Sequence, residues 1–249
     1  SSNFSFSSSN TLVVVGRSSN IGSSVLVSSS NASSDLGPGL ASSGGNSFGL
    51  DGSSSNIGGA QSMSLPSILI GTYTSNNQNS GFTYLNGVSA TASGTGSITG
   101  STVFNFLVGG GSYTGDIGEV VYYNRGISAQ ERAQVQSYLG IKYGISLDPA
   151  SQPNYYASDG TLIWTGASNT GYSNTVFGIG GDSTSGLNQR QSRSSLGRDI
   201  LTLSLSSTAS SNVLNGGDFG GDKRFLLVGN NGALTSSITT SGLPLNSGT

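Results

Sequence analysis

The sequence predicts an all-β protein with one amphipathic helix, and three observations support this fold class. The apolar runs are short, rich in β-branched and aromatic residues, and bounded by Gly, Ser and Asn. Charged residues make up 8% of the chain, and the net charge of −2 is far from the high charge of disordered chains. The segment 128–144 alone shows convincing three- and four-residue apolar spacing of a helix.

Seven apolar runs are the expected strands, and the Ser-, Gly- and Asn-rich stretches between them are expected to be loops or polar strand faces. In chain order, the runs are Leu12–Val15, Val25–Val27, Ser67–Ile70, Val103–Val108, Thr161–Trp164, Ile200–Leu205 and Phe225–Val228.

The segment GDIGEVVYYNRGISAQERAQVQSYLGIKYGI, residues 115–145, combines a strand with the helix. In the strand, a period of two places Glu119, Val121 and Tyr123 on the same face as Ile117. Ser128 and Glu131 have the spacing of a capping box, and Gly144 ends the helix. The helical spacing predicts that Val135, Tyr138, Leu139 and Lys142 pack, whereas Gln130, Arg132, Gln134 and Gln136 face water.

This segment resembles the closing strand and trailing helix of laminin-G-like, concanavalin A-type jelly rolls in bacterial surface proteins. There G-x-I-x-E-V-x-x-Y-N-R-x-[IL]-S-x-x-E precedes a helix ending in Y-L-x-x-K-Y-G-I. Residues 155–194 and 225–232 resemble a β-rich module that follows this jelly roll in large secreted proteins of Bacteroidota-type bacteria. Where those proteins have G-I-G-R-D-D, residues 178–183 read GIGGDS, which lacks the basic residue and one acid.

The resemblance implies a concanavalin A-like jelly-roll sandwich with one C-terminal helix, followed by a second sandwich-like β-rich domain. The expected boundaries are 1–147 for the jelly roll, 148–153 for a proline-containing linker, and 154–249 for the second module. We expect a piece of a longer protein. The related jelly rolls have strands before Leu12–Val15, and FLLVGNNG (225–232) lies well inside their second module.

Charge is distributed unevenly, since Arg17, Asp35 and Asp51 are the charged residues before Asp116. The chain therefore has no basic stripe of the kind that nucleic-acid binding needs. Arg190, Arg193 and Arg198 form one cluster, interpreted as a solvated strand face or as local pairing with Asp182 and Asp199, with an anion site as the alternative. No run of about 18 apolar residues predicts a membrane span.

The absence of His and Cys from the sequence excludes Ser-His-Asp and Cys-His catalysis and ordinary zinc sites. A carboxylate pair of the glycoside-hydrolase kind is the remaining catalytic option, with Asp116 and Glu119 as candidates. Their three-residue offset on a strand places them on opposite faces unless a bulge intervenes. We therefore expect no enzymatic activity.

Two kinds of binding site remain open. Calcium prefers carboxylate and carbonyl oxygens, and Asp35, Asp51 and Asp116 are the carboxylates available, with a role as turn formers and caps as the alternative. Tyr113 lies in the glycine-rich turn GGGSYTGD and, with Asp116, is the candidate for binding carbohydrate. The alternative for Tyr113 is packing against the adjacent strand.

The function expected from these observations is that of a non-enzymatic structural or adhesive module in a protein secreted to the bacterial cell surface. A nearly uncharged surface rich in hydroxyls and amides allows copies of the chain to approach closely, so the expected partner is the chain itself, in an oligomer or filament. The alternative is a lectin-like carbohydrate-binding module, calcium-dependent, with surface glycans as partners.

Overall fold

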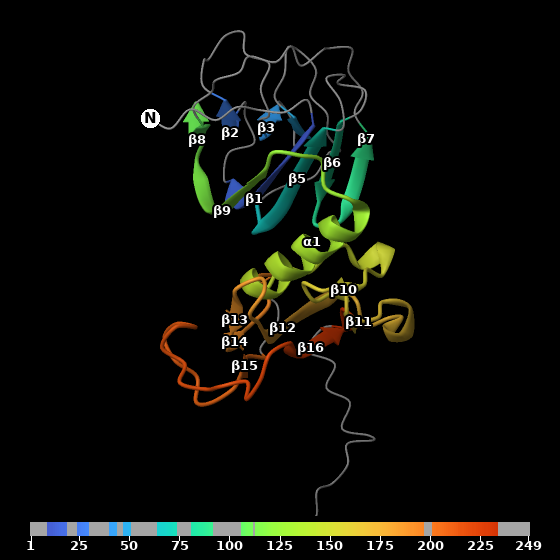
Figure 1. Cartoon of the computed structure of the whole chain (residues 1–249), viewed down its shortest axis with the longest axis vertical. Helices are drawn as coiled ribbons and strands as arrows, with labels where there is room; N and C mark the ends of the chain where they lie inside the picture. The colour runs from blue at the N-terminus through green and yellow to red at the C-terminus, as the bar shows by residue number, and fades with distance from the viewer. Residues whose placement is uncertain are drawn as a thin grey trace, which may run out of the picture.

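The computed structural model describes residues 9–18, 24–29, 40–43, 47–50, 64–73, 81–91, 106–111, 113–196 and 201–233 (Figure 1). Strands dominate this part of the chain, which contains one α-helix, α1 (Ala129–Tyr143). The predicted all-β class, with a helix at the predicted place, is confirmed.

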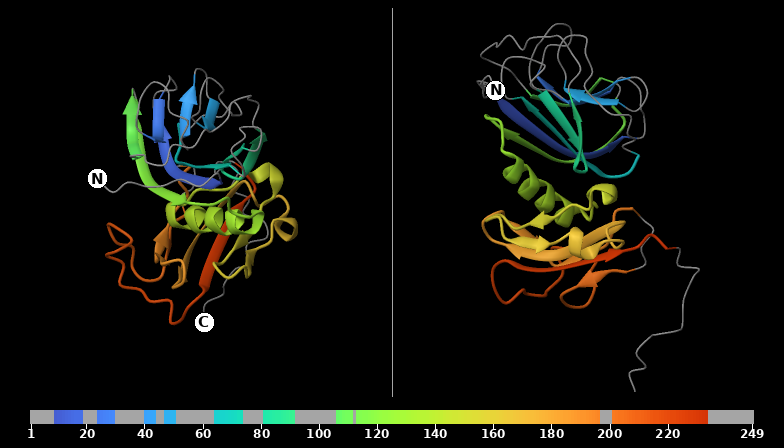
Figure 2. Two further views of the ribbon diagram at one scale, coloured as in Figure 1. Left: turned by 45° about the horizontal axis from the view of Figure 1, so that its top comes forward. Right: turned by 90° about the vertical axis from the view of Figure 1, so that its right-hand side faces the viewer.

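Two sheets form the N-terminal half of the described residues. A five-stranded sheet has the order β7-β6-β5-β1-β9, and a four-stranded sheet has the order β4-β3-β2-β8. The four-stranded sheet lies on one side of the five-stranded sheet and α1 lies on the other (Figure 2). The strands are β1 (Asn10–Ser18), β2 (Ser24–Ser29), β3 (Leu40–Ser43), β4 (Ser47–Leu50), β5 (Ser67–Tyr73), β6 (Gly81–Leu85), β7 (Val88–Thr91), β8 (Phe106–Gly111) and β9 (Gly115–Tyr123).

Strand β1 is buried on both faces, which explains why its apolar residues are consecutive rather than alternating. It pairs antiparallel with β5 on one side and with β9 on the other. Val13 and Val15 belong to the core cluster that includes α1, so the period of two points Leu12 and Val14 toward the four-stranded sheet. A layer on each side therefore covers this strand.

The predicted strand at 117–123 is confirmed as β9, but its pairing with β1 is interrupted. Val15 pairs with Glu119 and Gly16 pairs with Ile117, which leaves Gly118 as an extra residue in a bulge. The ring of Tyr143 packs against Gly118, where a side chain on this residue would crowd it.

Helix α1 begins and ends as the sequence predicts. Ser128 is the N-cap, the reciprocal bonds of the capping box to Glu131 are both present, and Gly144 ends the helix with a φ of 64°. The prediction that Gln136 faces water is wrong, because its side chain is 6% exposed. Ser137 and Leu139 are fully buried, so the helix is covered on more than one face.

A second β region covers the other side of α1 (Figure 2). Its strands are paired as β10-β11, β13-β12-β16 and β14-β15 in the described residues. They are β10 (Tyr155–Tyr156), β11 (Leu162–Trp164), β12 (Thr175–Asp182), β13 (Leu187–Gln189), β14 (Gln191–Ser192), β15 (Leu203–Ser204) and β16 (Arg224–Asn230). Within the expected strand Ile200–Leu205, the structure describes residues 201–205, and Leu203–Ser204 are the residues that form a strand there. In the expected strand Val103–Val108, β8 accounts for the described residues 106–108.

One apolar core joins the two β regions through α1. The five-stranded sheet, the helix and the second region all contribute buried side chains to it: Val13, Val15, Ile68, Ile70, Leu139, Ile141, Ile145, Leu147, Tyr155, Val176 and Leu187. The predicted linker at 148–153 is ordered within this arrangement, since Pro149–Ser151 forms a 3₁₀ turn capped by Asp148. The Asp148 N–H donates to the carbonyl of Asn86 in the turn between β6 and β7, 2.7 Å away.

Candidate functional site

Two ion pairs hold α1 against β9 and against the turn that follows β9, and we call them the helix clasp. The first pair joins Lys142 Nζ to Glu119 Oε2 at 2.9 Å. Lys142 also donates to the Tyr138 hydroxyl at 2.7 Å, and the Tyr143 hydroxyl lies 3.1 Å from Glu119 Oε2. Burial lowers the pKa of Lys142, but its hydrogen bonds to Tyr138 and Glu119 outweigh burial and leave the pKa above its usual range.

The second pair of the helix clasp lies at the start of α1. Arg125 binds Glu131 through both terminal nitrogens, at 3.0 and 2.5 Å, while Glu131 also accepts the Ser128 N–H. The hydrogen bonds from Arg125, followed by those from Ser128, lower the pKa of Glu131 to about 2. Glu119, Arg125, Glu131 and Lys142 thus find their ion-pair partners within the strand–helix segment 115–145, which indicates that these four charges serve to pack α1.

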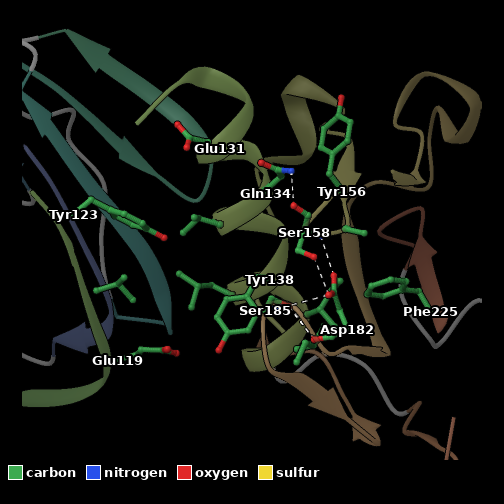
Figure 3. A pocket seen from close by; sticks show the side chains of 16 residues that line it. Glu119, Tyr123, Glu131, Gln134, Tyr138, Tyr156, Ser158, Asp182, Ser185 and Phe225 are labelled. Carbon is green, nitrogen blue, oxygen red and sulfur yellow. Dashed lines mark hydrogen bonds between the residues drawn. The ribbon is translucent and has the colours of Figure 1, made fainter. Parts of the chain in front are cut away.

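A cavity of about 390 Å³ lies along α1 between β9 and the second β region, and we call it the α1 groove. Figure 3 shows Glu119 and Tyr123 at one side, and Ser158, Asp182 and Phe225 at the opposite side. Its lining mixes aromatic, aliphatic and polar side chains: Glu119, Val121, Tyr123, Glu131, Gln134, Val135, Tyr138, Leu139, Ile141, Tyr156, Ala157, Ser158, Asp182, Ser185, Leu187 and Phe225.

Asp182, which lines the α1 groove, has a structural role at the end of β12. Its side chain is 2% exposed and accepts the N–H and the hydroxyl of Ser158, at 2.9 and 2.8 Å. The N–H groups of Thr184 and Ser185 also donate to it. These bonds fix the turn after β12 to the turn after β10, so the carboxylate has its hydrogen-bonding capacity filled.

A second, more polar cavity of about 570 Å³ lies between the C-terminal end of α1 and the loop 202–212. Its amide side chains are engaged in bonds within the protein. Gln191 exchanges two hydrogen bonds with Ala209, and Asn212 Oδ1 accepts the backbone N–H groups of Arg190 and Gln191. The Gln191 and Asn212 amides are therefore already hydrogen-bonded within the protein and are less available to a ligand than the polar lining suggests.

The predicted carbohydrate residues, Tyr113 and Asp116, lie together beside β1 and away from both cavities. The Tyr113 hydroxyl lies 2.8 Å from the carbonyl of Arg17 and 3.0 Å from that of Asp116. The Asp116 carboxylate binds Arg17 Nε at 2.6 Å, with 69% of its side chain exposed. These contacts agree with the alternative for Tyr113, in which it packs against the adjacent strand, because its hydroxyl binds the backbone of β1.

Asp116 and Glu119, the two carboxylates considered for catalysis, bind different partners in different places. The bulge at Gly118 lies between them, so the period of two does not by itself place Asp116 and Glu119 on opposite faces. Asp116 pairs with Arg17 at the surface, whereas Glu119 pairs with Lys142 against α1. Asp116 does not line the α1 groove.

The calcium prediction rests mainly on residues for which the structure gives no description, because Asp35 and Asp51 lie outside the described ranges. No group of three or more His, Cys, Asp or Glu side chains suited to a metal ion occurs in the described residues. Asp116 already binds a guanidinium, which a cation would have to displace. Calcium binding stays a prediction.

The predicted arginine cluster is divided by the structure. Arg190 holds the loop 205–217, since its Nη1 donates to the carbonyl of Asn215 at 2.9 Å. Its Nε donates to the side chain of Asn188 in β13. Arg193 is exposed, and Arg198 and Asp199 lie outside the described residues. Arg190 does not pair with Asp182 as the sequence suggested, because its partners are the Asn188 side-chain oxygen and the Asn215 carbonyl, while Asp182 binds Ser158, Thr184 and Ser185.

Sequence reasoning missed the α1 groove. Its lining comes from positions between 119 and 225, and no local motif connects them. The one signal present was the alternation of Glu119, Val121 and Tyr123 on one strand face, which all line the groove.

A family described as a domain of unknown function (DUF8202) matches residues 131–247, from α1 to near the end of the chain. A comparison with curated proteins gave no match. Among solved structures, the chain is similar to Trypanosoma rangeli sialidase in complex with 2,3-difluorosialic acid, a covalent intermediate. The identity is 20%, the match covers 48% of this chain and 21% of the sialidase, and the TM-score is 0.37. The chain thus spans about a fifth of that protein's length, and a likeness this low carries no argument about this chain.

Within the part of the chain that the structure describes, no helix has the length and apolar character required to cross a membrane.

Proposed function

We propose that this chain is a non-enzymatic structural or adhesive module of a secreted bacterial cell-surface protein, and that it associates with copies of itself. The proposal includes a concanavalin A-like jelly roll at 1–147 and a second β-rich domain at 154–249. The observation that carries it is the helix clasp, because Glu119, Lys142, Arg125 and Glu131 are occupied in holding α1 to β9 and to the turn that follows β9.

The absence of catalysis is supported by the state of the carboxylates near the α1 groove. Glu131, whose pKa is about 2, stays ionised and is a poor proton donor. Glu119 and Asp182 each bind several donors of the protein. An assay of the wild-type chain against a panel of aryl glycosides, with Glu119→Gln beside it, should give equal background rates. Turnover by the wild type that Glu119→Gln abolishes would overturn the non-enzymatic proposal.

Self-association is supported by two surface features. The described sheets end in edge strands, such as β7 and β9 of the five-stranded sheet, which can accept a further strand. Val213 and Leu214 are 84% and 68% exposed in an ordered loop, and exposed apolar side chains of this kind favour protein contacts. The low charge of the chain adds little repulsion between copies.

The test of self-association is sedimentation velocity over a hundredfold range of protein concentration, followed by electron microscopy of the most concentrated sample. We expect the sedimentation coefficient to rise with concentration and ordered assemblies to appear. A concentration-independent monomer without assemblies would refute self-association.

Carbohydrate binding is the second candidate function, and the α1 groove favours it. Aromatic side chains next to polar groups form the usual lining of a small-molecule site.

A further inference from the structure

The α1 groove lies at the edge of the packed core and combines aromatic rings with hydrogen-bonding groups that the protein leaves free. Tyr123, Tyr138, Tyr156 and Phe225 contribute rings from four different elements, namely β9, α1, β10 and β16. All four side chains are partly exposed. Rings of this kind bind the apolar C–H faces of ligands while the tyrosine hydroxyls remain available to polar groups.

The hydroxyls of Tyr123 and Tyr138 can each donate a hydrogen bond to a ligand, whereas Figure 3 shows the Tyr156 hydroxyl directed away from Glu119 and Tyr123. The Tyr123 hydroxyl makes no hydrogen bond to the described part of the chain, and burial raises its pKa, so it stays protonated. The Tyr138 hydroxyl accepts from Lys142, and the Tyr156 hydroxyl accepts from Asn154 at 3.1 Å. A hydroxyl that accepts in this way keeps its own proton for another acceptor.

Two acceptors complete this set. Glu119 receives Lys142 and Tyr143 on Oε2, which leaves Oε1 for a ligand. Gln134 donates through Nε2 to the carbonyl of Ser158, and its Oε1 has no bond to the described residues. The groove thus offers donors and acceptors together, which a purely apolar ligand would leave unsatisfied at a cost.

The charges of the lining select against anions. Glu119 and Glu131 are paired with Lys142 and Arg125, which do not line the groove, whereas Asp182 binds only N–H and hydroxyl donors among the described residues, so the lining itself carries negative charge. A ligand carboxylate would face like charges here, which disfavours acidic sugars. A ligand cation would have to compete with the ion pairs already formed. A neutral, hydroxyl-rich ligand meets neither penalty.

We propose that the α1 groove binds a neutral saccharide, with its C–H face on the tyrosine rings and its hydroxyls on Tyr123, Tyr138, Glu119 and Gln134. The volume of about 390 Å³ lies within the range of small-ligand pockets, at its small end, which suits a short saccharide. This inference deepens the adhesive part of the proposed function and rests on it, but it does not depend on self-association.

The test is calorimetric titration of the whole chain with a panel of oligosaccharides. Neutral members contain glucose, galactose, mannose or N-acetylglucosamine, and acidic members end in sialic or uronic acids. We expect at least one neutral class to bind and the acidic members to bind at least tenfold more weakly. Tyr123→Phe removes one hydroxyl and keeps the ring, and should weaken binding about fivefold, as the loss of one hydrogen bond does.

Three further variants locate the site. Tyr123→Ala should weaken binding more than tenfold because the ring is lost as well. Tyr172→Phe, at an exposed tyrosine outside the groove, and Tyr113→Phe, at the tyrosine predicted from the sequence, should bind as the wild type does. Circular dichroism of each variant establishes that it is folded.

The proposal is overturned if no neutral saccharide binds at millimolar concentration, if acidic members bind as tightly as neutral ones, or if folded Tyr123→Ala binds like the wild type. Sedimentation of the same samples separates the two ideas. Saccharide binding can fail while the chain still assembles, and in that case this inference alone is lost.

Discussion

The two β regions on either side of α1 are stabilised by different means. The five-stranded sheet is held by consecutive aliphatic side chains, with Leu12, Val14 and Ile70 fully buried. The second region also buries Val176, Phe177 and Ile179, but its loops are held by polar side chains that bind backbone groups. Asp182 accepts from two turns, and the buried Asn215 binds Ser204, Ser206 and Gly217.

This difference between the two regions indicates that a sequence with few apolar residues can still specify an ordered domain. Hydrophobic burial gives about 25 cal/mol per Å² and requires apolar side chains. Where Ser, Asn and Gly dominate, buried side-chain amides and carboxylates bind the N–H and C=O groups of loops. These hydrogen bonds supply part of the stability that hydrophobic burial supplies elsewhere. The rings of Phe225 and Phe219 also pack directly against Gly180 and Gly181 of β12, so a few aromatics cover much backbone.

The largest effect is expected from Leu139→Ala, which tests whether the two regions are energetically separate. Leu139 is fully buried in the core shared by both regions, so its truncation should cost about 4 kcal/mol of unfolding free energy. Denaturation followed by the fluorescence of Trp164, which lies in the second region, should coincide with denaturation followed by circular dichroism. Two separate midpoints would mean that the shared core does not couple the regions.

The next effect is expected from Asp182→Ala, which tests the polar network. Removal of the carboxylate leaves the Ser158 and Thr184 N–H groups without acceptors, at a cost of about 2.5 kcal/mol. Asp218→Ala, at an exposed aspartate of the same region, is the matched control and should change stability by less than about 0.5 kcal/mol. Equal effects of the two variants would show that the network contributes nothing.

A smaller effect is expected from acid, through the helix clasp that joins α1 to the first region. The pKa of Glu131 is lowered from 4.5 to about 2 by Arg125 and Ser128. Because the folded pKa lies below the unfolded one, this stabilisation is present above about pH 4.5 and is lost as the pH falls toward 2. Glu131→Gln should lose less stability over this range in urea titrations. A variant curve parallel to that of the wild type would contradict this role.

The smallest effect on stability is expected from replacing Val213 and Leu214 together by Ser. Both side chains are exposed, so the unfolding free energy should change by less than about 0.5 kcal/mol. Self-association should weaken at least tenfold in sedimentation experiments. Leu162→Ser, at an exposed leucine of β11, is the control and should assemble normally. Unaltered assembly of the double variant would exclude this loop from the contact.

The sequence predicted the elements whose signals are local. The apolar runs indicated β1, β5 and β16, and the spacing of Ser128 and Glu131 indicated the start of α1. Gln136 was misplaced because helical periodicity identifies one packed face, whereas a second β region covers a further face of this helix.

The candidate site could not be predicted because its residues meet only through the tertiary fold. Tyr123 and Phe225 are about a hundred positions apart and share no motif, yet both line the α1 groove. The hydrogen bonds of Asp182 and Asn215 were equally hidden, since a Ser- and Asn-rich segment shows no periodicity that distinguishes buried amides from solvated ones. Tyr113 drew attention through its glycine-rich turn, but its hydroxyl contacts the backbone.

The position of α1 between two β regions has a practical consequence for dissecting the protein. A fragment that stops at Leu147, where the sequence suggests a domain end, would keep the first sandwich but strip the cover from Ile141, Ile145 and Leu147. Such a fragment would carry a helix with a bare apolar side and would aggregate, even with every strand of the sandwich intact. The second half cut at 154 would equally lack the helix that seals Tyr155 and Val176. The helix therefore belongs to the core of both halves. Whichever half is expressed with the helix, the other half loses the apolar surface that covers its core.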